Sequence, residues 1–292
     1  MGTSPFAVTV LDSLAGTRHR PGLVVTRPDR PRGRGRKPAP PAVATAAAAL
    51  GIELAQPERL GDVAEQIGRA QPATLVVCAY GALVREPLLS TYEILNVHPS
   101  VLPRWRGAAP IERAIMAGDT RTGVSIIRLT AGLDSGPICA QETMPIDPDD
   151  TYGTLAGRLA TLSARLLIGA LDGPRNYVEQ TDDGLTYAEK IGPEDRILDP
   201  ERTPIELART VRALDPHIGA RIETPSLTGG LRVQVAGVAA DGGGSGTRPG
   251  ALGVEDGRLY YGARDGALEL VRVQPPGGRP MDAADYIRGH AV

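Results

Sequence analysis

Two polar side chains on one short apolar segment could together stabilise an oxyanion and move a proton. Residues 94–98 read ILNVH, which places Asn96 and His98 two positions apart. In a β-strand this spacing puts both side chains on the same face. An asparagine amide can donate a hydrogen bond to a developing oxyanion, and a histidine can exchange a proton near neutral pH. An isolated Asn-x-His pair also fits a capping asparagine and a hydrogen-bonded core histidine. The pair alone therefore does not distinguish a catalytic site from a structural one.

Two loops farther along the chain carry additional polar residues. Residues 100–107 (SVLPRWRG) place two arginines around Trp105, the only tryptophan. Residues 131–137 (AGLDSGP) follow another strand and carry Asp134 in a glycine-rich stretch. That stretch fits an ordinary turn. It also fits a carboxylate that is brought to His98, orients its ring and stabilises its protonated form.

The elements around these residues alternate between strands and helices. Strands are predicted at residues 23–26, 52–54, 74–79, 94–98, 124–129 and 138–145, and helices at 3–16, 42–50, 59–70, 110–117 and 152–171. The first helix is expected to be capped by Ser4. Alternation predicts a doubly wound α/β domain, and the continuous apolar run at 74–79 is typical of a strand in a parallel sheet. Ligands of such open sheets bind beyond the carboxyl ends of the strands, where Asn96 and His98 lie.

The pattern changes near Tyr187. After a helix at 202–214, short strands with turn signals are predicted at 220–223, 231–236, 251–254, 258–262 and 267–273. Such spacing is typical of a small β-barrel. The predicted organisation is therefore an α/β catalytic domain at residues 1–186, a linker at 187–200 and a C-terminal β-barrel at 201–292.

Charge is unevenly distributed over the 292 residues. With 32 basic and 34 acidic side chains, the formal net charge is −2. The segment Arg18–Lys37 holds eight basic side chains and one acidic, so it carries +7 and the rest of the chain −9. Within it, residues 27–41 (RPDRPRGRGRKPAPP) are dominated by charges, prolines and glycines, which predicts a loop. Its alternating arginines suit contact with phosphates. A solvated flexible loop is the alternative interpretation.

Several protein classes are excluded or disfavoured by the same sequence. Recurring apolar runs without a Gly-x-y period exclude a disordered or collagen-like chain. The only two cysteines, Cys78 and Cys139, cannot form a disulfide framework or a multi-cysteine metal site, and they suit a reducing cytoplasm. We find no apolar stretch of the ~18 residues that span a bilayer, and no signal peptide. A nicotinamide-dependent oxidoreductase is disfavoured because no G-x-G-x-x-G follows a first strand.

The segment Asn96-Val-His98-Pro-Ser100-Val-Leu-Pro103-Arg104, followed by the Asp134 loop, resembles the formyltetrahydrofolate-dependent formyltransferase family. Four further blocks resemble the members of that family that act on methionyl initiator tRNA. They are RPDRP with GRGRK at residues 27–37, PRWRGAAPI at 103–111, YAEKI at 187–191 and VQPPGGRPM at 273–281. The blocks occur in the family's order over nearly the whole chain, so the resemblance is far more specific than the Asn-x-His pair.

The resemblance implies a fold, a reaction and a set of residues. The fold is a Rossmann-like formyltransferase domain followed by a barrel similar to the oligonucleotide-binding fold. The reaction transfers the formyl group of 10-formyltetrahydrofolate to the amino group of methionine on initiator tRNA, without a metal. The implied catalytic residues are Asn96, His98 and Asp134. The implied folate-binding residues are Ser100, Val101, Leu102 and Pro103, with Val101 where the family usually has leucine, together with Tyr80 and Gly81.

The resemblance also assigns partners. The implied tRNA-binding residues are Arg30, Arg32, Arg34, Arg36 and Lys37, with Arg34 matched to the central arginine of the family's loop, and the C-terminal barrel is expected to contact tRNA. The protein is expected to be a cytoplasmic monomer that does not bind membranes. Two alternatives stay open. One is a formyltetrahydrofolate enzyme acting on a sugar nucleotide, glycinamide ribonucleotide or water, and the other is a catalytically silent RNA-binding protein.

The N-terminus departs from the family pattern. The segment Met1-Gly2-Thr3-Ser4-Pro5-Phe6 matches the end of the family's first strand and the turn after it. The resemblance therefore implies that the first, central strand is missing from the sequence, and we expect translation to start upstream of Met1. Without that strand, its two neighbours would have unpaired edges.

Overall fold

The computed structural model describes residues 1–32, 37–224, 229–240 and 242–290. The chain divides into two compact units. The first unit contains residues 1–110, 121–145 and 156–188, and the second contains residues 111–120, 146–155 and 189–292. The α/β architecture with a separate antiparallel β domain is confirmed. The predicted boundaries at residues 186 and 200 stay a prediction.

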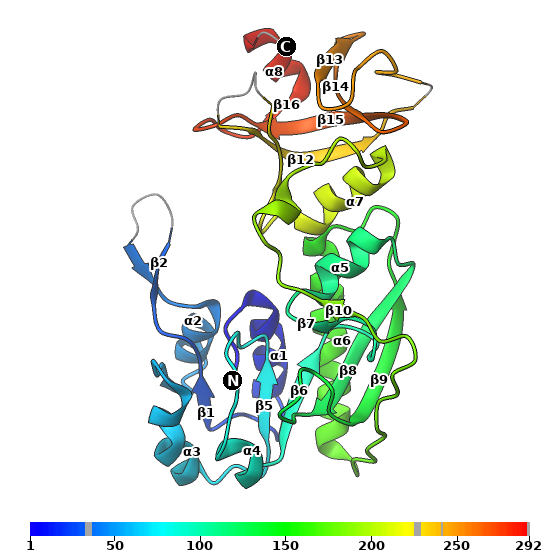
Figure 1. The fold of residues 1–292 in the computed structure, drawn as a ribbon. Coiled ribbons are helices and arrows are strands. Elements are labelled where there is room, and N and C mark those ends of the chain that lie inside the picture. Colours follow the sequence, from blue (N-terminus) through cyan, green and yellow to red (C-terminus); the bar gives the residue numbers. More distant parts are fainter. Residues whose placement is uncertain (33–36, 225–228, 241, 291–292) are drawn as a thin grey trace. The chain divides into compact units, whose positions relative to one another are not determined.

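The central sheet of the first unit contains β5 (Leu75–Cys78), β6 (Ile94–His98), β8 (Arg121–Arg128) and β9 (Ile138–Pro145), in that order (Figure 1). Strand β6 is parallel to β5 and antiparallel to β8, and β8 is antiparallel to β9. Only the β5–β6 pair therefore follows the parallel pattern expected from alternating strands and helices. The connection from β8 to β9 contains no helix, so these strands pair as neighbours in a hairpin. That connection carries Asp134.

A second, two-stranded sheet pairs β1 (Leu23–Val25) in parallel with β4 (Glu53–Ala55). Helix α2 (Ala42–Ala49) lies between these two strands in the chain. The predicted helix at 59–70 consists of a 3-10 turn, η1 (Leu60–Val63), followed by α3 (Ala64–Ala70). The short helix α4 (Leu88–Thr91), which we did not predict, precedes β6.

Met1 and Gly2 lie between the two sheets (Figure 1). The N–H of Gly2 donates to the carbonyl of Val25 at 3.1 Å, and the N–H of Cys78 donates to the carbonyl of Met1 at 2.9 Å. Among the described residues no strand lies between β1 and β5, as the resemblance led us to expect. Two residues therefore provide the pairing that a whole strand would supply.

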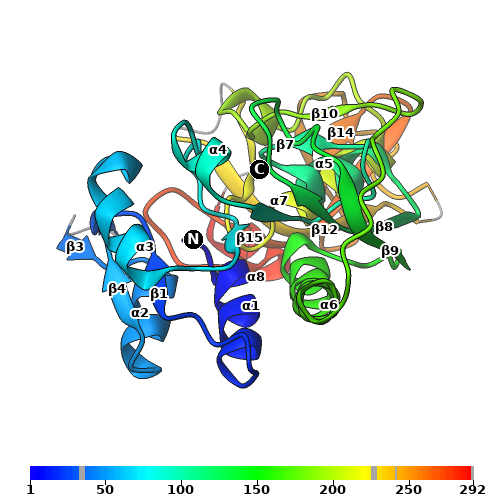
Figure 2. The same ribbon diagram turned by 90° about the horizontal axis from the view of Figure 1, so that it is seen from below.

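Helices α1 (Pro5–Ala15) and α6 (Tyr152–Asp172) lie on the same side of the first unit's sheet (Figure 2). Ser4 occupies the N-cap position of α1, but its side chain makes no capping bond and its buried hydroxyl has no partner among the described residues, so the predicted cap is wrong. The first turn instead begins with Pro5, whose missing N–H needs no partner there.

By length and composition α6 is apolar enough to cross a membrane, with a hydropathy of 1.2 over 18 residues, which corrects our expectation that no segment qualifies. The core helix of a soluble protein passes the same test, so one such helix is weak evidence for a span. Leu155, Leu159 and Leu167 of α6 are fully buried.

The prediction that residues 27–41 form a loop is wrong for two short segments. Residues Arg30–Arg32 form β2 and residues Lys37–Ala39 form β3, which pair as an antiparallel hairpin. Pro31 and Pro38 lie opposite each other in this hairpin. Proline has no N–H to donate, so the pairing depends on the amides of the flanking residues, and edge strands tolerate this arrangement.

The second unit is built on an antiparallel sheet. Its strands run in the order β11 (Ala220–Ile222), β12 (Leu231–Val238), β15 (Gly266–Gln274), β14 (Arg258–Ala263) and β13 (Leu252–Glu255), and β16 (Met281–Asp282) pairs with β15. Helices α7 (Pro204–Leu214) and α8 (Ala283–Gly289) pack on it, and their buried residues join the sheet in one hydrophobic core. The predicted C-terminal β domain is confirmed as an antiparallel sheet, and its closure into a barrel stays a prediction.

Contacts between side chains join distant segments within the second unit. Arg113 of α5 (Pro110–Ala117) forms two hydrogen bonds with the carboxylate of Asp195, in the 3-10 turn η2 (Glu194–Arg196). The bonds from Arg113 are the main reason that the pKa of Asp195 is lowered. The ring of His217 stacks on Tyr152 with 3.6 Å between ring centroids, and its Nε2 lies 2.9 Å from Oε1 of Glu112.

Candidate active site

The carboxylate of Asp134 is the centre of a polar cluster in the first unit. Its Oδ1 accepts a hydrogen bond from Nδ2 of Asn96 at 3.0 Å, and its Oδ2 accepts one from the backbone N–H of Gly107 at 2.9 Å. Nδ1 of His98 lies 3.6 Å from Oδ2. The side chains of His98 and Asp134 are only 4% and 13% exposed, so solvent screens their interaction weakly. The structure thus brings together all three side chains that were predicted to be catalytic.

The strand β6 and the β8–β9 connection create this meeting point. Asn96 and His98 pair with Ile127 and Ser125 of the neighbouring strand β8, near the carboxyl end of β6. Asp134 follows β8 in the hairpin connection, where its φ of 44° is in the left-handed region. Aspartate is one of the few residues other than glycine that adopt this conformation readily.

His98 is held in one tautomer. Its Nε2 lies 2.8 Å from the backbone oxygen of Trp105. Because a carbonyl oxygen only accepts, we assign the proton of the neutral ring to Nε2. Nδ1, which faces Asp134, is therefore the nitrogen that takes up or releases a proton.

The segment Trp105–Gly107 is fixed by hydrogen bonds to residues 186–188, a distant part of the chain. The N–H of Trp105 donates to Oγ1 of Thr186 at 2.9 Å, and β7 (Arg106–Gly107) pairs in parallel with β10 (Tyr187–Ala188). A Cβ on Gly107, whose φ is 124°, would lie 2.7 Å from the carbonyl oxygen of Ala188. Only glycine allows the backbone to approach Ala188 this closely. The approach brings the N–H of Gly107 within hydrogen-bond distance of Asp134.

Gln180 is a site residue that sequence reasoning missed. Its Nε2 donates to the backbone carbonyls of Asp134 at 2.8 Å and Gly136 at 2.7 Å, and its Oε1 accepts from Nε of Arg106 at 2.9 Å. It lies in an irregular segment after α6, where neither periodicity nor spacing distinguishes it. Only the fold could reveal it.

The predicted folate-binding loop divides into buried and half-buried positions. Ser100 is fully buried, and its hydroxyl donates to the carbonyl of Arg104 at 2.7 Å. Leu102 is also buried, and its N–H donates to Oγ of Ser125. Ser100 and Leu102 therefore shape the loop, whereas Val101 and Pro103 are half-buried.

The turn after β5 shows a similar division. Tyr80 belongs to the hydrophobic core of the first unit, and burial raises the pKa of its hydroxyl against the opposing effect of Arg27. Gly81 is exposed and has a φ of 73°. The Tyr80 side chain thus acts as part of the core, and the exposed backbone at Gly81 is the part that could meet a ligand.

Three of the five predicted tRNA-binding residues lie on β2 and β3. Arg30 is exposed at the start of β2. Arg32 and Lys37 belong to β2 and β3. Arg34 and Arg36 lie outside the described residues. Nearby, Nε2 of Gln56 donates to the carbonyl of Arg27 and to Oδ1 of Asp29, which fixes the start of the hairpin to the segment after β4.

The chemistry available at Asp134 follows from these contacts. A protonated Nδ1 of His98 would face the carboxylate, which stabilises the positive charge. The side-chain amide nitrogen of Asn96 carries two hydrogens, and it donates one of them to Asp134. The cluster can therefore offer a hydrogen bond to an oxyanion and exchange a proton beside it. In the described part of the chain no three His, Cys, Asp or Glu side chains gather as a metal site would require.

Fold and site together are those of a formyl transferase. Residues 1–171 match the family model described as formyl transferase, and residues 190–291 match the model of its C-terminal domain. All residues of the Asp134 cluster except Gln180 and the β10 segment lie within the first match.

Curated relatives narrow the assignment. The methionyl-tRNA formyltransferase of Halorhodospira halophila is 44% identical over 299 aligned residues, which cover 100% of this chain and 95% of the relative. The methionyl-tRNA formyltransferase of Rubrobacter xylanophilus is 43% identical, with coverages of 100% and 96%. The chain belongs to the methionyl-tRNA formyltransferase family.

Solved structures share the fold at low identity. HypX from Aquifex aeolicus in complex with tetrahydrofolic acid matches with a TM-score of 0.62 and 18% identity, over 82% of this chain and 43% of HypX. An N-formyltransferase from Helicobacter canadensis matches with a TM-score of 0.64 and 16% identity, over 92% of this chain and 96% of that protein.

Proposed function

We propose that this enzyme transfers the formyl group of 10-formyltetrahydrofolate to the amino group of methionyl initiator tRNA, in the cytoplasm and as a monomer, for the initiation of translation. The observation that carries the proposal is the convergence of Asn96, His98 and Asp134 within hydrogen-bond or ion-pair distance. The relatives named for this reaction align along the whole chain.

The reaction proceeds by addition and elimination. The free amine of the methionyl group attacks the formyl carbon, forms a C–N bond and gives a tetrahedral oxyanion. The second N–H of Asn96 and the protonated ring of His98 stabilise the negative charge. The C–N bond to N10 of the folate then breaks. The proton that the amine loses passes to N10 through His98 or water, so formyl-methionyl-tRNA and tetrahydrofolate are the products.

Asp134 has two functions in this proposal. Its charge stabilises the imidazolium form of His98, and its hydrogen bonds fix the Asn96 amide and the Gly107 backbone. Asn96, His98 and Asp134 thus act as one unit, because the same carboxylate holds the other two in place.

Substrate binding is assigned to the neighbouring loops. Val101 and Pro103 contact the folate, Ser100 and Leu102 hold the loop that carries them, and the backbone after Tyr80, at Gly81, forms another wall. The β2–β3 hairpin contacts the acceptor end of the tRNA through Arg30, Arg32, Arg34, Arg36 and Lys37. The C-terminal domain provides a second tRNA contact.

A formyl-transfer assay tests the proposal. The full chain is incubated with 10-formyltetrahydrofolate and one of four acceptors: methionyl initiator tRNA, methionyl elongator tRNA, free methionine or water alone. We expect formylation of the initiator tRNA only. Release of formate without tRNA, as fast as transfer to the initiator tRNA, would identify a hydrolase. Formylation of free methionine as fast as that of the initiator tRNA would show that the enzyme does not need tRNA.

A further inference from the structure

A single buried hydroxyl, that of Ser125 on β8, attaches the loop at residues 100–103 to the sheet. Its Oγ donates to the carbonyl of Ser100 at 2.7 Å and accepts from the N–H of Leu102 at 3.1 Å. It also accepts from Nε2 of Gln141 at 2.8 Å. A hydroxyl has one hydrogen and two lone pairs, so these three bonds use its whole capacity. Because Ser125 is fully buried, solvent cannot replace any of them.

Gln141 on β9 reinforces the same attachment. Its Nε2 also donates to the carbonyl of Leu102 at 3.0 Å. Ser125 lies opposite His98 in the β6–β8 pair and opposite Gln141 in the β8–β9 pair. Residues that face each other across antiparallel strands point to the same side of the sheet. The loop that follows His98 therefore turns back over this side of the sheet, where Ser125 and Gln141 bind it.

Gly123, two positions before Ser125, leaves space for a side chain of the loop. A Cβ on Gly123 would lie 2.8 Å from Cγ2 of Val101. Positions two apart on a strand share a face, so Gly123 lies under the same loop as Ser125. The hydrogen bonds at residues 100 and 102, together with the packing of Val101, thus fix three consecutive positions of the loop.

We propose that Ser125 and Gln141 are positioning residues of the formyl-donor site: their hydrogen bonds hold residues 100–103 in the conformation that binds the folate. This inference rests on the proposed assignment of that loop to folate binding. Since Ser125 is closed to solvent, it acts through the backbone of the loop and not by touching the folate.

The hairpin that holds this loop also carries Asp134. Residue 134 lies in the connection between β8, which contains Ser125, and β9, which contains Gln141. One pair of strands therefore fixes both the donor loop and the carboxylate that faces His98. The loop is attached by hydrogen bonds between groups that do not ionise. Loosening it should weaken folate binding and leave the protonation of His98 unchanged.

The experiment compares the full wild-type chain with Ser125→Ala and Gln141→Leu. Ser163→Ala is the matched control, because Ser163 is also fully buried but its hydroxyl has no hydrogen-bond partner among the described residues. Calorimetry measures the dissociation constant of tetrahydrofolate. We expect this constant to rise about tenfold in Ser125→Ala and about fivefold in Gln141→Leu, because buried hydrogen bonds are lost. The control should bind tetrahydrofolate like the wild type.

Hydrogen exchange and kinetics distinguish positioning from a general loss of stability. Exchange of the Leu102 amide should become faster in Ser125→Ala, which removes its acceptor. KM for 10-formyltetrahydrofolate should rise with the dissociation constant, whereas kcat, its pH profile and KM for methionyl initiator tRNA should stay near the wild-type values. Gln141 is half-buried, so its variant tests the proposal even if Ser125→Ala does not fold.

Gln141→Glu provides a signature that a merely structural role would not produce. A carboxylate cannot donate to the carbonyl of Leu102, whereas a protonated carboxyl group can. The folate affinity of this variant should therefore be low at neutral pH and should approach that of the wild type as the pH falls.

Several results would overturn the proposal. One is an unchanged dissociation constant in Gln141→Leu together with faster exchange at Leu102, since the loop would then be loosened without effect on the folate. Another is equal weakening of binding in Ser163→Ala. A change confined to kcat or to KM for tRNA would also contradict it. If the wild type itself binds no tetrahydrofolate, the proposed function fails, and this inference fails with it.

Discussion

The side-chain amide of Gln180 donates a hydrogen bond to the backbone carbonyl of Asp134, at 2.8 Å. The orientation of this amide is unambiguous, because Arg106 on its other side can only donate. Gln180 therefore connects the two loops that meet at His98, the one that contains Trp105 and the one that contains Asp134. The side chain of Gln180 thus fixes the left-handed backbone of Asp134, the residue proposed to support His98.

Replacing this amide tests its positioning function. In Gln180→Glu, the carboxylate still accepts from Arg106 but can no longer donate to the carbonyls of Asp134 and Gly136. We expect kcat to fall about tenfold with little change in KM for either substrate, together with a shift of the kcat–pH profile, because Asp134 no longer holds its position beside His98. The control is Gln274→Glu, since Gln274 also donates to a backbone carbonyl but lies in the second unit. A change in melting temperature alone, with an unchanged pH profile, would show that Gln180 is merely structural.

Removing the charge of Asp134 tests the acid–base assignment. Asp134→Asn keeps the size of the side chain, yet one of its two ends becomes a donor that faces Asn96 or Gly107. We expect kcat to decrease at least 100-fold, in the range found for positioned acid–base groups, while the folate dissociation constant changes little. Steady-state kinetics and equilibrium folate binding provide the two readouts. Turnover close to that of the wild type would disprove the proposed role.

The contact between Gly107 and Ala188 predicts a strong effect of one methyl group. Gly107→Ala would place a Cβ 2.7 Å from a backbone oxygen and would also strain a positive φ. Gly51→Ala is the matched control, because Gly51 has a φ of 63° but its Cβ would meet nothing within 4 Å. A side chain at either positive φ costs on the order of 1–3 kcal/mol in backbone strain. We expect Gly107→Ala to lose more stability than the control in urea unfolding, and to lose activity as well.

The arginine-rich hairpin predicts salt-dependent tRNA binding. Arg34→Ala should raise KM for methionyl initiator tRNA and lower the slope of log affinity against log salt by about 1, because one phosphate contact is lost. Folate binding should stay the same. Arg69→Ala, on the exposed face of α3, serves as a control for general loss of positive charge. If both variants weaken tRNA binding equally, the hairpin has no special function.

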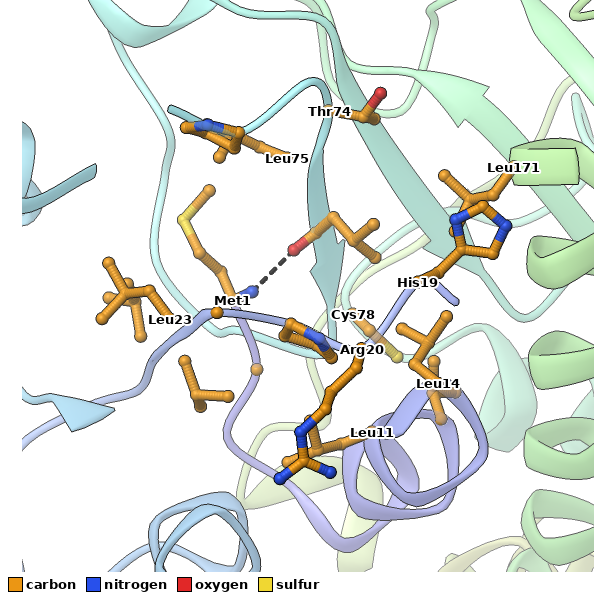
Figure 3. A pocket seen from close by; sticks show the side chains of 18 of the residues that line it. Met1, Leu11, Leu14, His19, Arg20, Leu23, Thr74, Leu75, Cys78 and Leu171 are labelled. Carbon is orange, nitrogen blue, oxygen red and sulfur yellow. Dashed lines mark hydrogen bonds between the residues drawn. The ribbon is translucent and has the colours of Figure 1, made fainter. Parts of the chain in front are cut away.

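In a chain that begins at Met1, the buried terminal ammonium group (Figure 3) predicts that stability depends on pH. Its pKa is lowered from 8.0 to about 6 in the folded state, so the folded protein binds this proton less tightly than the unfolded chain. Above pH 8 the group is neutral in both states and has no effect. As the pH falls from about 8 to about 6, the free energy of unfolding should decrease by up to about 3 kcal/mol.

The measurement of this effect is urea unfolding at several pH values, with mass spectrometry to verify that Met1 is retained. N-terminal acetylation is the control, because it removes the titrating group. If the acetylated and free forms show the same pH dependence between pH 6 and 8, another group is responsible.

The sequence could predict the meeting of Asn96, His98 and Asp134 for a physical reason. Asn96 and His98 share a strand, where a period of two fixes their common face, and the family resemblance supplied Asp134. The contacts of Gln180 and Thr186 could not be predicted, because they depend on how an irregular segment folds back onto two loops. Hydrophobic periodicity has no signal for such a segment.

The same reasoning explains where element predictions were wrong. Residues 30–32 and 37–39 contain prolines and charges that favour a loop locally, but antiparallel pairing with Pro31 opposite Pro38 overrides this preference. Ser100 and Leu102 illustrate a related case. Their motif marks a ligand loop, yet the side chains themselves are buried within the protein, and a motif alone does not separate residues that shape a loop from those that contact a substrate.

The pairing of β7 with β10 has a consequence for the order of protein synthesis. Asn96, His98 and Asp134 have all been translated by residue 134, but the partners of Trp105, Arg106 and Gly107 lie at residues 180–188. A nascent chain that has exposed only its first 171 residues therefore contains every predicted catalytic group without the segment that positions them. The contacts that hold residues 105–107 can therefore form only after Ala188 has left the ribosome.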